Sequence, residues 1–217
     1  MFPSLDVWED RLARSPAGQM ALDEALLLGA RDPSLRLYRW AVPAATFGYA
    51  QRLADVRPRA GALALVRRWT GGGIVIHGGD LTLALAVPAR FDFCRQKPVE
   101  IYHRIHSALL PALAEFFPGV RLAVPADCRI GPACFEAPAP DDILSGGVKI
   151  CGGALRRGRH GILYQGSIAL AGADCSASIA HAFSADIRIN SQAAQIEKMA
   201  LRLTAEKYAT AAWNAMR

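Results

Sequence analysis

Two side chains in the second half of the chain, those of Cys134 and Lys149, are of the types needed for covalent chemistry. Cys134 lies in a proline-rich segment that is predicted to be a loop, and Lys149 lies in a predicted strand further along the chain. A thiol beside a cation ionises more readily, and the thiolate is the nucleophilic form. A partly desolvated lysine can act as a base or donate a hydrogen bond to a developing oxyanion. The pair could therefore supply a nucleophile and its activating partner.

Each of these residues also has a plain structural interpretation. Lys149 lies between Val148 and Ile150, so strand alternation could direct its side chain to solvent, and a single cysteine is more often an inert core residue. Cys151 is a competing nucleophile, because residues two apart in a strand face the same side of the sheet. The rarity of lysine favours the functional interpretation of Lys149. Among 25 basic residues, the lysines are Lys97, Lys149, Lys198 and Lys207.

A second stretch, Arg67 to Asp80 (RRWTGGGIVIHGGD), combines two arginines, consecutive glycines and a histidine. Apolar runs at 63–66 and 81–87 flank it, which predicts buried strands on both sides. Glycines there indicate either a tight turn or a ligand lying against the backbone, where any Cβ would collide. The arginines favour a ligand, because guanidinium groups suit carboxylates and phosphates. The stretch is no nucleotide P-loop, because no Gly-Lys-Ser/Thr follows and the segment enters a strand.

The elements that must position these residues are short strands between amphipathic helices. Pro16 to Gly29 is predicted to be a helix with Ser15 as its cap. A second helix is predicted from 99 to 117, with a kink at Pro111, and 55–61 is predicted to be a connector. Residues 142–151 are predicted to form a hairpin that turns at consecutive glycines and carries Lys149 on its second arm.

The composition excludes several classes of protein. The chain has 217 residues, 52% of them hydrophobic and 20% charged, which is typical of a globular domain. We find no secretory signal and no apolar run long enough to span a bilayer. Five cysteines without a C-x-x-C pair argue against a disulfide framework and a zinc site, and favour a reducing cytoplasm. His103 and His106 could share a metal, but no third ligand accompanies them, so we expect a polar helix face and no metal.

Several blocks of the sequence, in order, resemble the lipoate–protein ligase A and octanoyltransferase family, which belongs to the biotin/lipoate protein ligase superfamily. They extend over most of the chain and include both stretches described above. The blocks are MALDEALL at 20–27, LYRW at 37–40 with FGYAQ at 47–51, RRWTGGGIVIH at 67–77, GVKICGGA at 147–154 and LYQGSI at 163–168.

This resemblance implies an α/β (α+β) fold, with residues 1–217 as a single catalytic domain. Its central sheet would be mixed and largely antiparallel, with helices on both sides. A narrow pocket would hold a lipoyl or octanoyl chain, and Lys149 would contact the acyl carbonyl. The substrate-binding residues that the resemblance implies are Arg67, Arg68, Thr70, Gly71, Gly72, Gly73, His77, Gly152, Gly153 and Ala154.

The resemblance leaves the reaction open between two enzymes and a binding protein. In one octanoyltransferase class a Cys-Phe loop carries the acyl thioester, and Cys134-Phe135 matches it; Asp80-Leu81-Thr82 also resembles the transferase form. The leading hypothesis is therefore octanoyl or lipoyl transfer through a Cys134 thioester, without a cofactor. The alternative is a lipoate ligase that uses ATP and Mg²⁺ to form lipoyl-AMP, although no accessory domain is expected after residue 170. Leu155, in place of a polar residue, motivates a non-catalytic lipoate-binding homologue.

The partners implied by the resemblance are proteins. They are acyl carrier protein as the donor, and the lipoyl domains of dehydrogenase E2 subunits and the glycine cleavage H protein as acceptors. These proteins are typically acidic, which fits the formal net charge of +6, although a solvated arginine-rich surface would also explain that charge. We expect no nucleic acid, because no basic tract with interleaved aromatic residues is present, and no membrane.

Overall fold

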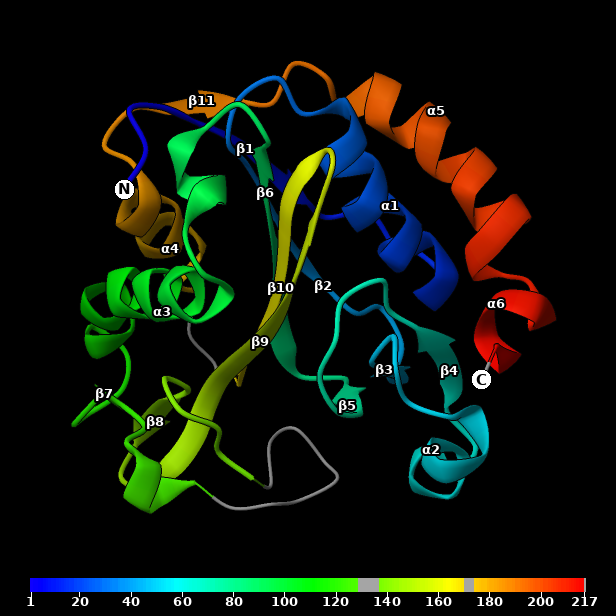
Figure 1. The fold of residues 1–217 in the computed structure, drawn as a ribbon, viewed down its shortest axis with the longest axis horizontal. Coiled ribbons are helices and arrows are strands. Elements are labelled where there is room, and N and C mark those ends of the chain that lie inside the picture. Colours follow the sequence, from blue (N-terminus) through cyan, green and yellow to red (C-terminus); the bar gives the residue numbers. More distant parts are fainter. Residues whose placement is uncertain (129–136, 170–173, 217) are drawn as a thin grey trace.

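The structure of the protein is a computed structural model that describes residues 1–128, 137–169 and 174–216. Strands gather into a sheet of eight, in the order β11-β1-β2-β6-β10-β9-β8-β7, and a sheet of three, in the order β4-β3-β5 (Figure 1). The strands are β1 (Leu5–Asp10), β2 (Ser34–Arg39), β3 (Ala44–Phe47), β4 (Ala64–Arg67), β5 (Val75–His77), β6 (Asp80–Pro88), β7 (Arg121–Leu122), β8 (Ile143–Ser145), β9 (Val148–Gly158), β10 (Gly161–Ala169) and β11 (Ile187–Ile189).

The larger sheet is mixed and largely antiparallel, as predicted. Strand β1 pairs in parallel with both β2 and β11, whereas the pairs from β2 across to β7 are antiparallel. The hairpin of β8 and β9 turns at Gly146 and Gly147, whose φ angles of 56° and 81° are readily adopted by glycine. This confirms the predicted hairpin and its glycine turn.

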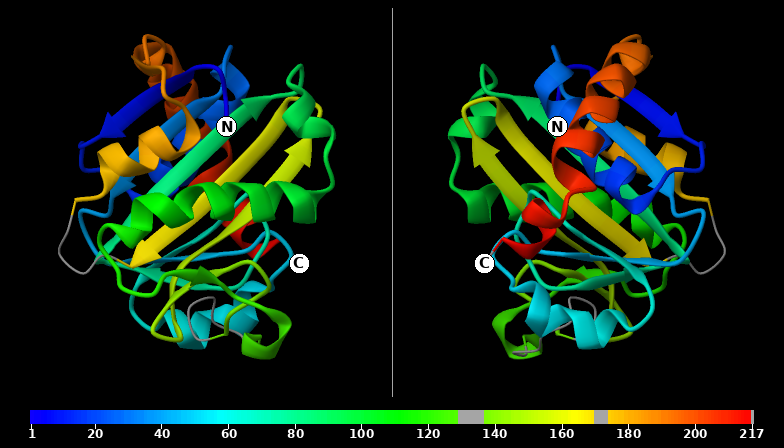
Figure 2. Two further views of the ribbon diagram at one scale, coloured as in Figure 1. Left: turned by 90° about the vertical axis from the view of Figure 1, so that its left-hand side faces the viewer. Right: turned by 90° about the vertical axis from the view of Figure 1, so that its right-hand side faces the viewer.

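Helices cover both faces of the larger sheet. Figure 2 shows α3 and α4 on one face and α1 and α5 on the other. The helices are α1 (Pro16–Gly29), α2 (Leu53–Ala60), α3 (Pro98–Ala114), α4 (Ser176–Phe183), α5 (Ala193–Leu203) and α6 (Ala211–Ala215), with short turns η1 (Asp92–Arg95), η2 (Pro125–Asp127) and η3 (Thr204–Tyr208). In the described parts of the chain, no helix combines the length and the apolar character needed to cross a membrane.

The predicted start of α1 is confirmed, and two other predictions are corrected. The Ser15 hydroxyl accepts the Gly18 N–H at 3.1 Å, which satisfies a donor of the first turn. The predicted connector at 55–61 is instead mostly helix α2, because Val56 and Ala60 are one turn apart and both are buried. Helix α3 contains Pro111 and ends at Ala114, before the predicted end at residue 117.

Strand alternation gives the two faces of the larger sheet different neighbours. On β6, Leu83 and Leu85 pack toward the apolar cluster that includes α3, whereas Ala84 and Ala86 belong to the cluster that includes α1. The same alternation continues on the neighbouring strands, where Tyr38 lies on the α1 face and Tyr164 on the α3 face. A residue on the α1 face of these central strands is therefore directed away from α3.

Candidate active site

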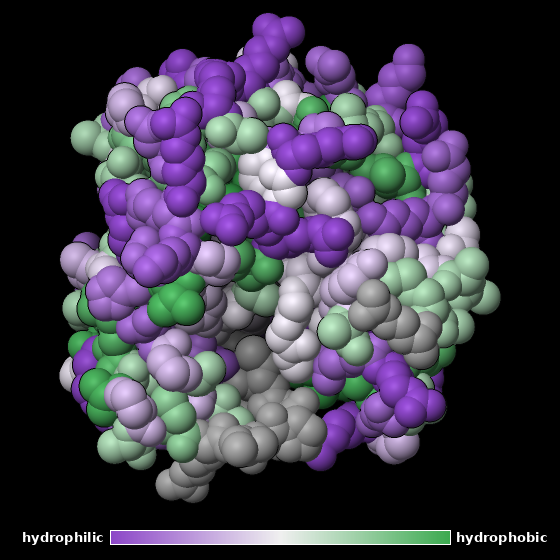
Figure 3. Space-filling model, viewed as in Figure 1, coloured by the Kyte–Doolittle hydropathy of each residue, from purple (hydrophilic) through white to green (hydrophobic). Residues whose placement is uncertain are grey.

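A narrow cavity lies on the α1 face, and one row of paired residues forms its floor. Gly152, Ser167, Thr82 and Tyr38 are directly opposite one another on β9, β10, β6 and β2, and all four line the cavity. At the usual spacing between strands this cavity floor is about 14 Å long. The cavity has about 420 Å³ of empty space, its mouth and the adjoining solvent included. Figure 3, which has the view of Figure 1, shows a hollow near the middle of the surface.

The smaller sheet and the loop after β4 supply the opposite wall, here called the cavity roof. It consists of Thr46, Arg68, Gly72, Val75 and His77. The residues implied by the sequence are therefore largely brought together. Those that line the cavity are Arg68, Gly72, His77, Gly152, Gly153 and Ala154; Arg67, Thr70, Gly71 and Gly73 do not line it.

Lys149 lies at the β9 end of the cavity floor. Its Nζ is 2.7 Å from Asp142 Oδ2, and both side chains are buried. A Cβ built on Gly152 would lie 2.6 Å from Lys149 Nζ, so the glycine leaves the space in which the lysine side chain lies along the strand. Lys149 does not itself line the cavity, but its ammonium group lies against Gly152, which lines the cavity at the β9 end of the floor, here called its head.

Cys151 is directed away from Lys149, which corrects the prediction that the two share one side of the strand. Simple alternation fails because the pairing of β8 with β9 shifts register between Ile143 and Leu144. Such a bulge changes which residues face each side. Ile150 and Cys151 both belong to the apolar cluster that includes α3, whereas Lys149 lies against Gly152 on the opposite face.

Asp142 and Tyr102 were not identified from the sequence, and they support Lys149. The Asp142 carboxylate accepts hydrogen bonds from the Tyr102 hydroxyl at 2.6 Å and from the Ala139 N–H at 2.6 Å. Burial, followed by the charge of Asp142, raises the pKa of Tyr102 well above 10, so its hydroxyl remains a donor. The same hydroxyl accepts the Gly153 N–H at 3.0 Å, which ties α3 to β9 beyond the end of β8.

His106 lies behind this group, and the sequence had indicated only a polar helix face there. Its Nδ1 is 2.7 Å from the carbonyl oxygen of Asp141, and its Nε2 is 2.7 Å from the Tyr164 hydroxyl. The carbonyl can only accept, so Nδ1 carries the proton and Nε2 accepts from Tyr164. Burial lowers the pKa of His106 to about 4. His106 is therefore neutral near pH 7 and holds the backbone next to Asp142 in place.

The glycine stretch is folded around the side chain of Arg68. Its guanidinium donates to the carbonyls of Gly71 and Gly73 at 2.9 and 2.7 Å, and to the Thr46 hydroxyl at 2.7 Å. Between them, Gly72 has a φ of 84°, which favours glycine. A Cβ on Gly48 would overlap the backbone of Gly71 and Gly72. These glycines therefore allow a close approach of backbone segments as well as a bare wall at Gly72.

Arg67, although adjacent in sequence, has a separate task away from the cavity. Its fully buried guanidinium donates to the carbonyls of Tyr49 and Gln51 at 2.7 and 2.6 Å, and to three carbonyls of the C-terminal segment, those of Trp213, Asn214 and Met216. Thr70 also lies behind the wall, where its hydroxyl donates to Gln165 Oε1 at 2.6 Å. Arg67 thus ties β4 to the end of the chain.

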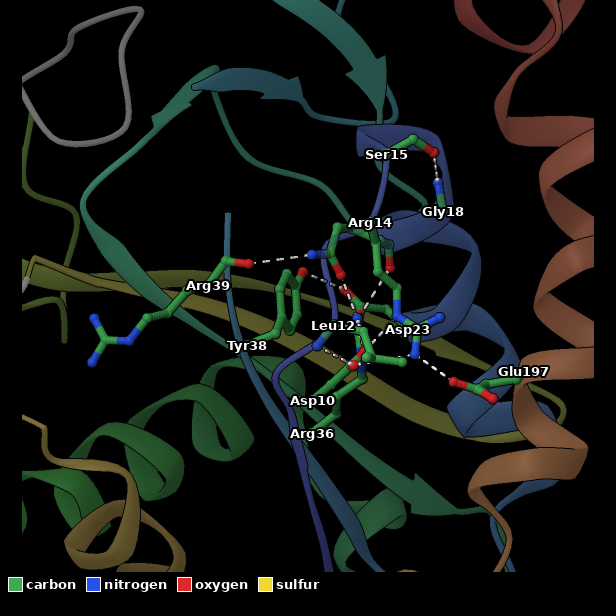
Figure 4. Close-up of polar contacts among 11 residues, drawn as sticks. Asp10, Leu12, Arg14, Ser15, Gly18, Asp23, Arg36, Tyr38, Arg39 and Glu197 are labelled. Atoms are coloured by element: carbon green, nitrogen blue, oxygen red, sulfur yellow. Dashed lines mark hydrogen bonds and ion pairs between the residues drawn. The ribbon is translucent and has the colours of Figure 1, made fainter. Parts of the chain in front are cut away.

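A buried polar cluster under α1 joins the far end of the cavity floor (Figure 4). Arg36 donates to Asp10 Oδ2 at 2.6 Å and to Asp23 Oδ1 at 2.7 Å. Asp23 also accepts from the Tyr38 hydroxyl at 2.9 Å and from Gln165 Nε2 at 2.6 Å. Burial raises the pKa of Asp23, and the charge of Arg36 acts in the opposite direction. The cluster therefore fixes two cavity-lining side chains from behind.

Asp80 links the cavity roof to the floor. It accepts from His77 Nδ1 at 2.8 Å, from Ser167 at 2.6 Å and from Thr82 at 3.1 Å. Burial by itself would raise the pKa of Asp80, but the hydrogen bond from His77, with the bonds from Ser167 and the Gly78 N–H, lowers it to about 2. Asp80 is therefore a carboxylate, and the cavity walls are joined through it.

Two predictions about reactive groups concern other parts of the chain. Cys134 lies outside the described residues, so its role stays a prediction from the sequence. His103 is bonded to Asp141 Oδ1 at 2.9 Å and is exposed. Across 1–128, 137–169 and 174–216, no three histidine, cysteine, aspartate or glutamate side chains come together as a group that could hold a metal.

Comparison with known proteins matches the chain to a family model. Residues 15–206 match the lipoyl protein ligase A/B catalytic domain. The octanoyltransferase LipM of Moorella thermoacetica is 36% identical over 175 residues, which cover 71% of this chain and 61% of that protein. The octanoyltransferase LipM of Staphylococcus aureus is 33% identical over 172 residues, which cover 72% and 62% of the two chains. The aligned part thus spans about three fifths of the length of these relatives.

Solved structures share the fold at lower sequence identity. A Thermoplasma acidophilum protein described as a lipoate protein ligase, solved with lipoic acid, superimposes with a TM-score of 0.76 at 21% identity and covers 100% of both chains. A lipoate-protein ligase A solved with ATP gives a TM-score of 0.72 at 20% identity and covers 99% of both chains. These likenesses establish a lipoate-ligase fold for the chain.

Proposed function

The chain belongs to the lipoyl protein ligase A/B catalytic-domain family, and from this premise we propose that it is an acyltransferase of protein lipoylation. It moves an octanoyl group from acyl carrier protein to a lysine of a lipoyl domain. The relatives named octanoyltransferase, at 33–36% identity, support this choice. The observation that carries it is the cavity floor, which crosses four strands and has the Lys149 ammonium at its head.

The acyl chain is proposed to lie along this floor, with its carbonyl at Gly152 and its tail toward Tyr38. Lys149 then stands beside the carbonyl oxygen, where an ammonium group stabilises the negative charge that develops during attack. Asp142 holds the ammonium from behind at 2.7 Å. A pre-positioned donor in a buried site stabilises an oxyanion more strongly than water would, because it needs no reorganisation.

The transfer is proposed to run through a thioester on Cys134. The Cys134 thiolate attacks the octanoyl thioester carbonyl, a new carbon–sulfur bond forms, and the thiolate of the carrier protein leaves. The acceptor lysine amine then attacks the Cys134 thioester, an amide forms, the cysteine thiolate is released and the amine gives up a proton. The Lys149 ammonium first gives its proton to the departing carrier thiolate, and its neutral amine can then take the proton of the acceptor lysine, which is the second role proposed for Lys149.

This route needs no ATP, Mg²⁺ or other cofactor, and the transferred octanoyl or lipoyl group enters as part of a substrate. The proposed acceptors are the lipoyl domains of dehydrogenase E2 subunits and the glycine cleavage H protein, and the proposed location is the cytoplasm. The formal net charge of +6 supports acidic protein partners through electrostatic steering. Residues 1–217 are proposed to act as one catalytic domain.

Intact-mass measurement after incubation with octanoyl carrier protein, without ATP, tests the proposal. We expect an octanoyl adduct that appears in the wild type and in Cys151→Ser but is absent from Cys134→Ser. Subsequent addition of a lipoyl domain should discharge the adduct to that domain. If no adduct forms and ATP with lipoate yields lipoyl-AMP, the protein is a ligase instead. If ligands bind with no turnover in either assay, it is a binding protein.

A further inference from the structure

The cavity has polar side chains along much of its length, although the proposed ligand is a hydrocarbon chain. Oxygen- or nitrogen-bearing side chains reach it from both sheets: Tyr38, Thr46, His77, Thr82, Gln165 and Ser167. An acyl tail cannot accept a hydrogen bond, so any donor aimed at it would lose its partner on binding. Which ligands such a wall accepts therefore depends on the direction in which its hydroxyl and N–H hydrogens point.

The hydrogens on the β6 side of the cavity all point toward one carboxylate. Asp80 Oδ2 accepts from His77 Nδ1, Thr82 and Ser167. Thr82 also accepts the Trp40 Nε1–H at 2.8 Å, so its own hydrogen is directed to Asp80. With Nδ1 of His77 protonated toward Asp80, Nε2 accepts from the Thr46 hydroxyl at 2.8 Å. Four potential donors are thereby turned away from the cavity.

The remaining polar side chains of the cavity also donate their hydrogen bonds to other groups of the protein. Tyr38 and Gln165 donate to Asp23, and a second contact joins Gln165 Nε2 to Met20 Sδ at 3.5 Å. In the described part of the chain, every buried side-chain nitrogen and oxygen has a partner. The Arg68 cation lies toward the head, since a Cβ on Gly72 would be 3.3 Å from Arg68 and 3.4 Å from Ala154 on β9.

We propose that Asp80 is a specificity-determining residue that acts through the cavity wall. Asp80 accepts hydrogen bonds from Ser167, Thr82 and His77. Only carbon atoms and the lone pairs of acceptors therefore face the tail half of the cavity. The cavity then accepts a plain acyl chain and rejects one that carries a ketone near its end, because the ketone oxygen loses its water and finds no donor. This inference rests on the proposed function, since it assigns the cavity to the acyl group.

The Asp80→Asn substitution reverses the direction of these hydrogens. The Gly78 N–H donates to Asp80 Oδ1 at 3.2 Å, so the amide oxygen of the variant keeps that bond and the amide nitrogen replaces Oδ2. The amide N–H groups then donate to Ser167 and Thr82, whose own hydrogens must turn elsewhere, into the cavity. The Nδ1 proton of His77, which Oδ2 accepted in the wild type, moves to Nε2. The variant should therefore offer donors to a ketone in the acyl tail.

The experiment compares two acyl donors on the carrier protein: octanoyl, and octanoyl with a ketone on the carbon before the terminal methyl. The quantity measured is the ratio of kcat/KM for the plain chain to kcat/KM for the keto chain. We expect a wild-type ratio of about tenfold or more and a ratio in Asp80→Asn that is smaller by roughly tenfold. In Asp80→Asn with Ser167→Ala the ratio should return toward the wild-type value, because one of the redirected hydroxyls is gone.

Two controls separate this role from a structural one. Asp10→Asn removes a buried carboxylate that does not line the cavity, and it should leave the ratio unchanged. Ser167→Ala alone should also leave the ratio unchanged, because its hydrogen already belongs to Asp80; this arm remains decisive if Asp80→Asn does not fold. An unchanged ratio in folded Asp80→Asn, or a widened ratio in Ser167→Ala, overturns the inference. If the wild type transfers neither chain, the proposed function itself fails.

Discussion

Lys149 and Arg36 are buried cations on the same face of the larger sheet, and they are held in opposite ways. Arg36 donates to Asp10, Asp23 and Gln19 and lies 4.0 Å over the Tyr38 ring. Strand β1, helix α1 and strand β2 thus meet around one rigid, planar guanidinium group. Lys149 has a flexible side chain that lies along Gly152, with its charge next to Asp142.

The difference shows how two buried cations on one sheet can have separate roles, one structural and one chemical. A guanidinium whose donors are all bonded fixes geometry and has nothing left for a ligand, whereas an ammonium is a point charge whose donors can rotate. Both ion pairs are costly to break, since removing one partner leaves a buried charge. We therefore expect Arg36 to be needed mainly for stability and Lys149 mainly for the reaction.

The largest expected effect is the loss of acyl transfer in Lys149→Arg. Arginine keeps the charge but cannot act as a base, and its planar group needs different room from that left by Gly152. We expect kcat to fall roughly 10²- to 10⁴-fold, the usual contribution of a positioned acid or base, with an unchanged far-UV spectrum. A variant that keeps more than about a tenth of the wild-type kcat, a barrier change below about 1.4 kcal/mol, contradicts a direct role.

The next effect concerns stability and should appear in Arg36→Met. The substitution strands Asp10 and Asp23 without their cation, and breaking a buried pair in this way costs about 3–5 kcal/mol. Urea unfolding monitored by tryptophan fluorescence measures the change, with Arg11→Met as the control, because Arg11 is an exposed arginine next to Asp10. Equal stability of the two variants would remove the contrast between Arg36 and Lys149.

A smaller effect on turnover is expected from Gly152→Ala. The new methyl group would occupy the space of the Lys149 side chain and shift the ammonium from the head of the cavity floor. A displacement of that size can lower the rate by roughly 10²-fold. Gly158→Ala is the matched control, because it lies on the same strand and its Cβ meets nothing within 4 Å. Similar kcat values for the two variants would show that the position of Lys149 is unimportant.

The smallest effect is a change in the pH dependence of stability, and it concerns His106. Burial lowers its pKa from 6.5 to about 4 in the folded protein, so the unfolded chain binds more protons between these values. Stability is then complete above pH 6.5 and is lost as the pH falls toward 4. Between pH 7 and pH 5 this amounts to about 2 kcal/mol. His106→Gln should lose less stability over that interval in urea titrations; a slope equal to that of the wild type would show that His106 does not cause it.

Residues around the cavity could be predicted from the sequence where the signals were local. Lys149, the glycine turn of its hairpin and the glycines at 71–73 and 152–153 stand out by type and by neighbours, and the sheet follows from the strand patterns around them. Arg67 and Arg68 show a limit of this reading. They are adjacent residues of the same type, but the Arg67 guanidinium donates to the C-terminal segment and the Arg68 guanidinium to the cavity roof. Only the fold distinguishes them.

Other features depended on contacts between distant parts of the chain. The role of Asp142 follows from its contacts with Tyr102 on α3 and Lys149 on β9, and no pattern in the sequence joins these three residues. The bulge that separates Cys151 from Lys149 arises from the pairing with β8, so alternation along β9 alone gave the wrong side. Helix α2 contains Pro58, and its buried contacts override the local signal of a connector.

A crystal structure of the protein with octanoate bound tests the central claim most directly. We expect a carboxylate oxygen within hydrogen-bond distance of Lys149 Nζ. We also expect the chain to cross β10 and β6 over Ser167 and Thr82 and to end near Tyr38. A chain bound on the α3 face of the sheet, or one bound in the cavity with its carboxylate at Tyr38, would contradict the account.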